Sequence, residues 1–189
     1  MKKTFILLFF FISIACLHAQ NFTWDVKFLA GRMHEAIPIS QIIRMETGDG
    51  FEFSITPQAN AHCYIVCYDS QRQIIIIHDQ QLTTGEEKLF GPFKLTEPGG
   101  TETIYIIMSS ERQTALESLI LTFNNNPGSR QHANNLYREV VRLQNSVSRL
   151  GEPASLYIPS GGTTRGNTQP HITRFSGRNL YVRTITIRH

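Results

Sequence analysis

The spacing of apolar residues changes from two to three or four partway along this 189-residue chain, and that change restricts the fold more than any other feature. Residues 51–56 alternate apolar and polar side chains before Pro57, which is typical of a strand with one face in a core. Residues 63–68 are apolar on both faces, and a polar turn separates them from the isoleucines at 74–77. These two segments predict a hairpin that is covered on both sides.

Five further segments have strand patterns, some of them weaker or less regular. Residues 24–29 and 39–45 are the weaker candidates, and residues 89–94 predict an irregular edge strand because they contain Gly91 and Pro92. A strand is also expected at 103–108 and another at about 179–188.

The last of these strands has a break in its alternation. Leu180 and Val182 share one face, whereas Ile185 and Ile187 share the other. A bulge or bend near residues 183–184 would reconcile the two halves.

Helical spacing begins at residue 116. Leu116, Leu119, Ile120 and Phe123 fit one helix, which the Asn, Pro and Gly residues at 124–128 end. A second helix, capped by Ser129, is expected to reach about residue 150. Its apolar residues recur every three or four positions: Ala133, Leu136, Val140, Leu143, Val147 and Leu150. Because the stripe is shorter than three heptads, packing on a sheet is favoured over a coiled-coil seam.

These patterns predict an α+β fold: an antiparallel β-sandwich-like core with a helical pair inserted before the last strand. Residues 20–189 are long enough for one domain with a real core. Within that domain the helical pair occupies about 111–150, a surface loop rich in Gly, Pro and Ser about 151–177, and the C-terminal strand about 179–188.

Residues 1–19 have the pattern of a secretory signal peptide: two lysines, an apolar run, and a small residue at the expected cleavage point, Ala19. The run is shorter than the roughly 20 residues needed to cross a bilayer. The mature protein is therefore expected to be extracytoplasmic, in the periplasm or associated with the outer membrane. The alternative is lipidation of Cys16, which would anchor the protein, although Ser13 stands where a lipobox usually has Leu.

Two cysteines remain in the mature chain, Cys63 and Cys67. On one strand their Cα atoms would lie about 13 Å apart, too far for a disulfide, so we expect reduced, buried thiols. His62 and Cys63 would point to opposite faces, which argues against a cysteine nucleophile beside a base. The spacing of these residues and His78 does not fit a zinc site either. No catalytic residue, metal or cofactor is expected.

Charge is unevenly distributed. Residues 20–129 carry 7 basic and 13 acidic side chains, whereas residues 130–189 carry 9 basic and 2 acidic ones. The basic end either docks on the acidic body or contacts an anionic partner, such as an acidic envelope protein or lipid head groups. Nothing in this balance demands nucleic acid. The Gly-rich loop at 161–166 lacks the Lys-Ser/Thr of a phosphate loop. The candidate partner-binding residues are Arg165, His171, Arg174 and Arg178, with Arg138 and Arg142 on the second helix.

Residues 46–112 carry a sequence resemblance. Residues 63–69 form an aromatic strand that ends in Asp69, Gly85-Glu86 follows the next strand, and Gly100-Thr101-Glu102 opens a strand that ends in Met108-Ser109. This order resembles the bacterial exported family catalogued as domain of unknown function 4384, although residues 77–79 and 108–109 depart from its usual pattern. The resemblance implies a β-rich exported module without established catalytic residues. It also implies turns at Gly85 and Gly100 and a local hydrogen bond at Glu102.

The expected function is therefore a non-enzymatic binding or accessory module of the bacterial cell envelope. Two alternatives stay open: a small envelope hydrolase without a recognisable catalytic constellation, and a lipid-anchored structural component of the outer membrane.

Expression of the full chain in a bacterial host should yield a mature protein that begins at Gln20, because signal peptidase cuts after a small residue. Intact-mass measurement checks this. A mass that corresponds to a lipid-modified N-terminus at Cys16 would instead establish the anchored form.

Overall fold

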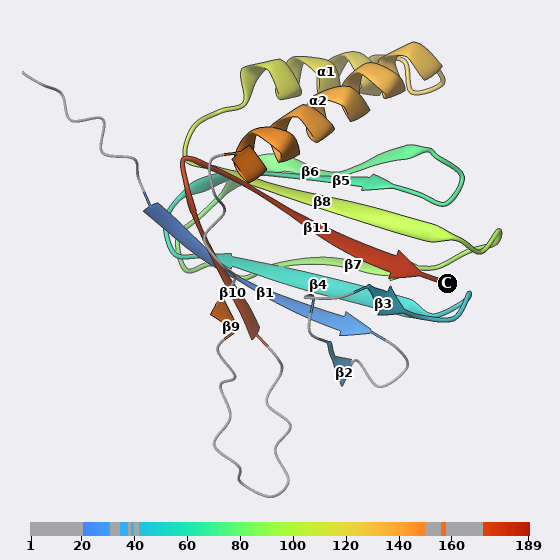
Figure 1. Ribbon diagram of the computed structural model, residues 1–189, viewed down its shortest axis with the longest axis horizontal. Helices are drawn as coiled ribbons and strands as arrows, with labels where there is room; N and C mark the ends of the chain where they lie inside the picture. Colours follow the sequence, from blue (N-terminus) through green and yellow to red (C-terminus); the bar gives the residue numbers. More distant parts are fainter. Residues whose placement is uncertain (1–20, 31–34, 38, 40–41, 150–155, 158–171) are drawn as a thin grey trace, which may run out of the picture.

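The computed structural model describes residues 21–30, 35–37, 39, 42–149, 156–157 and 172–189. They form two helices and a set of mainly antiparallel strands (Figure 1). In chain order these are β1 (Asn21–Ala30), β2 (Glu35–Ala36), β3 (Ile43–Arg44), β4 (Gly50–Pro57), β5 (Ala61–Tyr68), β6 (Ile74–Leu82), β7 (Lys88–Lys94), β8 (Thr101–Ser109), α1 (Thr114–Asn125), α2 (Arg130–Arg149), β9 (Leu156–Tyr157), β10 (Ile172–Arg178) and β11 (Leu180–Arg188).

The strands make two antiparallel layers that face each other. Their order is β6-β5-β8-β11-β10-β1-β4-β7, and the path folds at β10–β11, where the register contains a single pair, Arg178 with Leu180. Rings meet across the two layers: Trp24 of β1 lies 5.7 Å from Tyr181 of β11, and His78 of β6 lies 5.2 Å from Phe90 of β7. The predicted α+β sandwich with its helical pair is confirmed.

The helical pair covers the outer face of the β6-β5-β8-β11 layer (Figure 1). The Tyr64 hydroxyl of β5 donates to Glu117 of α1 at 2.6 Å and accepts the Gln113 amide at 3.0 Å. Tyr137 of α2 stacks on Tyr68 with ring centroids 4.6 Å apart. This layer is therefore covered on both faces, which explains why β5 and β8 read as continuous apolar runs.

Helix α2 begins where the sequence predicts. The Ser129 hydroxyl accepts the amide of His132 at 3.3 Å, the geometry of an N-cap. The stripe Leu136, Val140, Leu143 and Val147 is buried in the same core as the sheets. Packing on the sheet, rather than a coiled-coil seam, accounts for its spacing.

Three details of the strand prediction are wrong. Residues 172–178, expected in the surface loop, form β10, and residues 156–157 pair with it as β9. Among the described residues of the weak 39–45 segment, only Ile43–Arg44 is strand. The rest of the predicted loop up to residue 171 lies outside the described residues.

The expected bulge at residues 183–184 is also wrong, because β11 pairs with β8 in unbroken register from Leu180 to Arg188. Its odd positions face the sandwich interior and its even positions face α2, where Gln144 donates to Thr184 at 3.0 Å. The apolar alternation is interrupted in the sequence because Arg183 occupies an interior position. Its guanidinium lies 5.2 Å from the Phe175 ring centroid and donates to the Ile39 carbonyl at 2.9 Å.

Replacing Leu143, which is 2% exposed, with Ala should lower the free energy of unfolding by about 2–5 kcal/mol, because the change leaves a cavity between α2 and the sheet. Leu121 of α1 is the matched control: it is helical but 63% exposed, so Leu121→Ala should change stability by about 0.5 kcal/mol or less. Urea unfolding measures both. Equal effects of the two variants would contradict the packing of α2 on the sheet.

Candidate functional site

A cavity of about 140 Å³ opens between the two layers, on the side away from the β10–β11 corner. We call it the mouth cavity. It lies where β5 ends and β6 and β8 begin in one layer, and where β4 begins and β7 ends in the other. Its lining consists of Phe51, Cys67, Asp69, Ser70, Gln71, Ile75, Ile77, Phe93, Lys94, Leu95, Thr96, Glu102 and Ile104.

The walls of the cavity are mostly apolar. Phe51 and Phe93 meet with ring centroids 5.2 Å apart on one side, and Ile104 on the other side is fully buried. The β6 strand supplies Ile75, which is 51% exposed at the rim, and Ile77. Ile77 has no partner on β5, because the β5–β6 register shifts there by one residue. This bulge bends β6 at the cavity.

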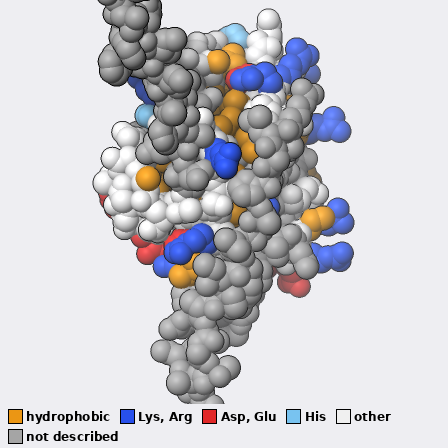
Figure 2. All heavy atoms as spheres, turned by 60° about the vertical axis from the view of Figure 1, so that its left-hand side comes forward, with side chains coloured by type: hydrophobic (Ala, Val, Ile, Leu, Met, Phe, Trp, Pro, Cys, Tyr) orange, Lys and Arg blue, Asp and Glu red, His pale blue; other side chains and the backbone are white. Residues whose placement is uncertain are grey.

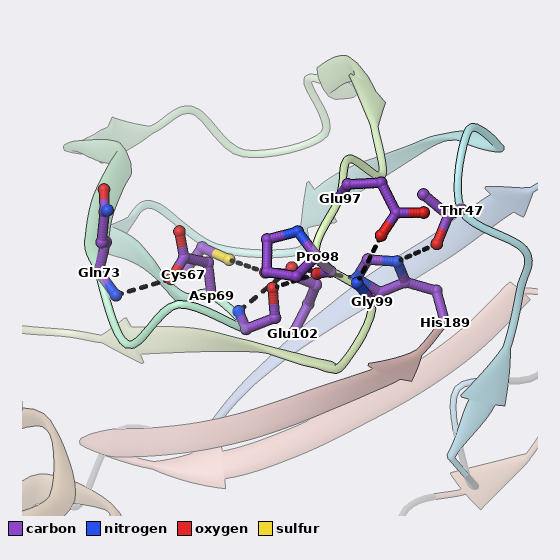
Figure 3. Close-up of polar contacts among 10 residues, drawn as sticks. Thr47, Cys67, Asp69, Gln73, Glu97, Pro98, Gly99, Glu102 and His189 are labelled. Carbon is purple, nitrogen blue, oxygen red and sulfur yellow. Dashed lines mark hydrogen bonds and ion pairs between the residues drawn. The ribbon is translucent and has the colours of Figure 1, made fainter.

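Glu102 is the centre of a polar cluster in the cavity wall (Figure 3). Its Oε1 accepts the Ser70 amide and the Nε2 of His189, each at 3.3 Å. Its Oε2 accepts the Cys67 thiol at a longer distance of 3.8 Å. Glu102 is therefore hydrogen-bonded, although its partners lie 32 to 87 residues away in sequence rather than close by, and the bond with Ser70 joins β8 to the turn after β5.

The buried His189 imidazole contacts the Glu102 carboxylate through its Nε2 atom. Its side chain is fully buried, and its Nδ1 lies 3.1 Å from the Thr47 hydroxyl. Because Nε2 faces a carboxylate it must carry a proton, so Nδ1 of a neutral ring accepts the Thr47 O–H. Two backbone hydrogen bonds with Gly100, at 2.8 and 3.0 Å, fix residue 189 beside the start of β8.

Gly100 allows the two loops around Glu102 to approach each other. A Cβ atom at this position would lie 2.7 Å from the Cβ of Ser70, closer than side chains tolerate. The Ser70 hydroxyl also donates to the Pro98 carbonyl at 3.0 Å. Asp69, the last residue of the aromatic-strand motif, accepts the Gln73 amide at 2.6 Å and holds the turn. Gly85 lies at a separate turn with a φ of +74°, as expected.

Both cysteines are free and buried, as predicted. Burial raises the pKa of the Cys67 thiol to about 12, and the nearby Glu102 carboxylate contributes in the same direction. Burial also raises the pKa of Cys63. A nucleophilic cysteine needs the opposite shift, so these thiols are poorly suited to covalent catalysis.

Among the described residues, neither His62 nor His78 is hydrogen-bonded to Cys63 or Cys67. Pairing with β8 places Cys63 opposite Met108 on the interior face, whereas the neighbouring His62 lies on the helix-facing side. His78 contacts the Phe90 ring across the sandwich, and burial lowers its pKa.

The basic residues singled out in the sequence are not brought together as one site. Arg174 forms a double hydrogen bond with Asp25 of the neighbouring strand β1, at 2.6 and 2.7 Å. Arg142 pairs with Glu139 one turn earlier on α2. Arg138 and Arg178 are exposed, and neither forms an ion pair with any residue that the structure describes. Arg165 and His171 lie outside the described residues.

Figure 2 shows basic side chains projecting along one margin of the molecule. The Arg174–Asp25 pair matches the prediction that the basic end docks on the acidic body, for this one residue.

Within the described chain, no helix is long and apolar enough to span a membrane, and no group of three metal-ligating side chains occurs.

Sequence reasoning missed the mouth cavity. Its apolar residues come from five strands and loops and have no common spacing, and Thr47 and His189 join Glu102 only through the tertiary fold. The one sequence signal that pointed to this site was Glu102, which belongs to the Gly100-Thr101-Glu102 motif. No family model matches the chain, and neither a curated protein nor a solved structure matches it.

Iodoacetamide should label almost none of the native mature protein at pH 8, because about one Cys67 thiol in ten thousand is ionised four pH units below its pKa. Labelling should accelerate as the pH rises toward 12, at Cys67 before the fully buried Cys63. Unfolding in urea should release both thiols, which provides the internal control. Rapid modification of native Cys67 at pH 8, read by mass spectrometry, would contradict the assigned burial.

Proposed function

We propose that this chain is a non-enzymatic binding module of the bacterial cell envelope and that the mouth cavity is its ligand site. One observation carries the proposal: a cavity of about 140 Å³ combines apolar walls with a single hydrogen-bonded polar cluster. Binding sites for small molecules typically have this composition. The volume suits a group of about six non-hydrogen atoms, since an apolar cavity of about 150 Å³ accommodates benzene.

The rival proposal, a small envelope hydrolase, has less support. The group beside Cys67 is a carboxylate that raises the pKa of the thiol rather than a base that activates it. Both nitrogens of His189 already have partners, Thr47 and Glu102, and its side chain is fully buried. This arrangement suits a structural support for Glu102 better than a catalytic base.

The envelope location rests on the signal-peptide pattern of residues 1–19. The lipid-anchored form through Cys16 remains the alternative for how the protein is held there. The resemblance over residues 46–112 also favours an exported accessory module.

An anionic partner is the second, weaker proposal for the same module. Arg138 and Arg178 are exposed and favour it. The pairing of Arg174 with Asp25 and of Arg142 with Glu139 counts against it, because both arginines already have a carboxylate. Any attraction of an acidic envelope protein or of lipid head groups would depend on the remaining basic residues and weaken with salt.

Titration of ¹⁵N-labelled protein with 1-pentanol tests the binding proposal. We expect saturable chemical-shift changes at Ser70, Ile75 and Ile104, with a Kd on the order of 1 mM. That affinity corresponds to about 0.7 kcal/mol per non-hydrogen atom, within the range for small ligands.

Ile75→Trp should abolish these changes by covering the rim of the cavity. Ile42→Trp is the matched control, because both isoleucines are 51% exposed but Ile42 does not line the cavity. If the parent shows no saturable shifts, or Ile75→Trp binds like the parent, the proposed ligand site is wrong.

A further inference from the structure

Among the described residues, one of the two carboxylate oxygens of Glu102 has no strong hydrogen-bond donor. An ionised carboxylate has about four acceptor positions. Ser70 and His189 both donate to Oε1, whereas the only donor to Oε2 among the described residues is the Cys67 thiol at 3.8 Å. A thiol is a weak donor, so Oε2 can accept a stronger hydrogen bond.

The charge of the cavity lining is complementary to a cation. Asp69 and Glu102 supply two carboxylates, and Lys94 supplies one ammonium group. Glu102 is 13% exposed, and its ion-pair contact within the described chain is the His189 imidazole at Oε1, which is charged only when protonated; no lysine or arginine of the described chain pairs with it. A largely buried carboxylate is stabilised when a cation with hydrogen-bond donors comes beside it.

The apolar walls define the rest of the ligand. Phe51, Phe93 and Ile104 line the same cavity as Glu102, so the cation must carry an apolar stem. A cavity of about 140 Å³ suits about five carbons and one nitrogen, because a similar volume accommodates the six carbons of benzene. A primary ammonium has three donors and a compact charge, which suits a single carboxylate oxygen better than a planar guanidinium does.

We infer that the mouth cavity binds a primary ammonium group on a short aliphatic stem, with the ammonium donating to Glu102 and the stem lying between Phe51, Phe93 and Ile104. The inference rests on the proposed function and specifies its ligand class. A free aliphatic amine and the lysine side chain of a polypeptide share this chemistry.

Three probes of nearly equal size test the ligand charge at pH 7: n-pentylamine, 1-pentanol and pentanoate. The Ser70 amide, which donates to Glu102, is the NMR reporter of head-group binding. We expect n-pentylamine to bind at least fivefold more tightly than 1-pentanol, and pentanoate at least fivefold more weakly. If the amine binds no more tightly than a detectably binding alcohol, the inference is wrong and the binding module survives. If none of the three binds, the proposed function itself is wrong.

Glu102→Gln keeps an acceptor for Ser70 and His189 but removes the negative charge. It should reduce the preference for the amine over the alcohol to about twofold or less and leave the affinity for 1-pentanol within twofold of the parent. Glu97→Gln is the charge-matched control: Glu97 accepts the Gly99 amide nearby but does not line the cavity, so the preference should persist. An unchanged preference in Glu102→Gln, or an equal loss in Glu97→Gln, would overturn the assignment to Glu102.

Lys94→Met provides a gain-of-affinity variant that does not depend on Glu102. Removing the only ammonium group among the described lining residues should tighten n-pentylamine binding about two- to fivefold without changing 1-pentanol binding. Unchanged or weaker amine binding in this variant would contradict a cation site.

The blocked lysine Nα-acetyl-lysine-N-methylamide distinguishes the two sources of the ammonium group. Binding as tight as that of n-pentylamine supports the inference with a polypeptide lysine as the source. Binding of n-pentylamine alone supports it with free small amines as the source, because the peptide backbone then does not fit at the rim.

Discussion

The fold depends on the sharp connection between β10 and β11, where the chain leaves one layer and enters the other through a single residue. Asn179 has a φ of +57°, a conformation that Asn tolerates better than most residues. Gly177 lies against Tyr181, and a Cβ atom on it would approach the Cβ of Tyr181 to 2.8 Å. Tyr181 can therefore pack on Phe175 and on Trp24, and the contact with Trp24 joins the two layers beside the corner. The corner closes one side of the sandwich.

The sandwich is not closed at the side opposite the β10–β11 corner, and the mouth cavity lies there. The layers end there in the edge strands β6 and β7, which do not pair with each other. Bulges shift the register in both edge pairings, and a cavity lined by both layers remains at this side. The hydrogen bonds of Glu102 with Ser70 and His189 hold the polar wall of this space in place. The proposed ligand site is thus formed at the unclosed edge of the sandwich.

The sequence predicted individual strands and helices better than it predicted which of them contact one another. Phe51, Phe53 and Ile55 alternate with polar residues, and Leu136, Val140 and Leu143 repeat at helical spacing, so burial on one face was readable from each segment alone. The pattern misled at β11, because Arg183 faces the interior and finds its partners, the Phe175 ring and the Ile39 carbonyl, in distant segments. The sequence did not predict β10, because the seven residues 172–178 follow a long Gly- and Ser-rich stretch and include Gly177.

What the sequence determined by itself is local: most of the sandwich strands, though not β9 or β10, the two helices, the Ser129 cap and the separation of Cys63 from Cys67. Each follows from residue type and spacing within one segment. The tertiary structure alone decided which segments meet. Glu102 and His189 are 87 residues apart, and Thr47 lies a further 55 residues before Glu102, yet the three are joined by hydrogen bonds. Long-range pairing of this kind depends on strand order and on close approaches such as that of Gly100 to Ser70, which no local periodicity encodes.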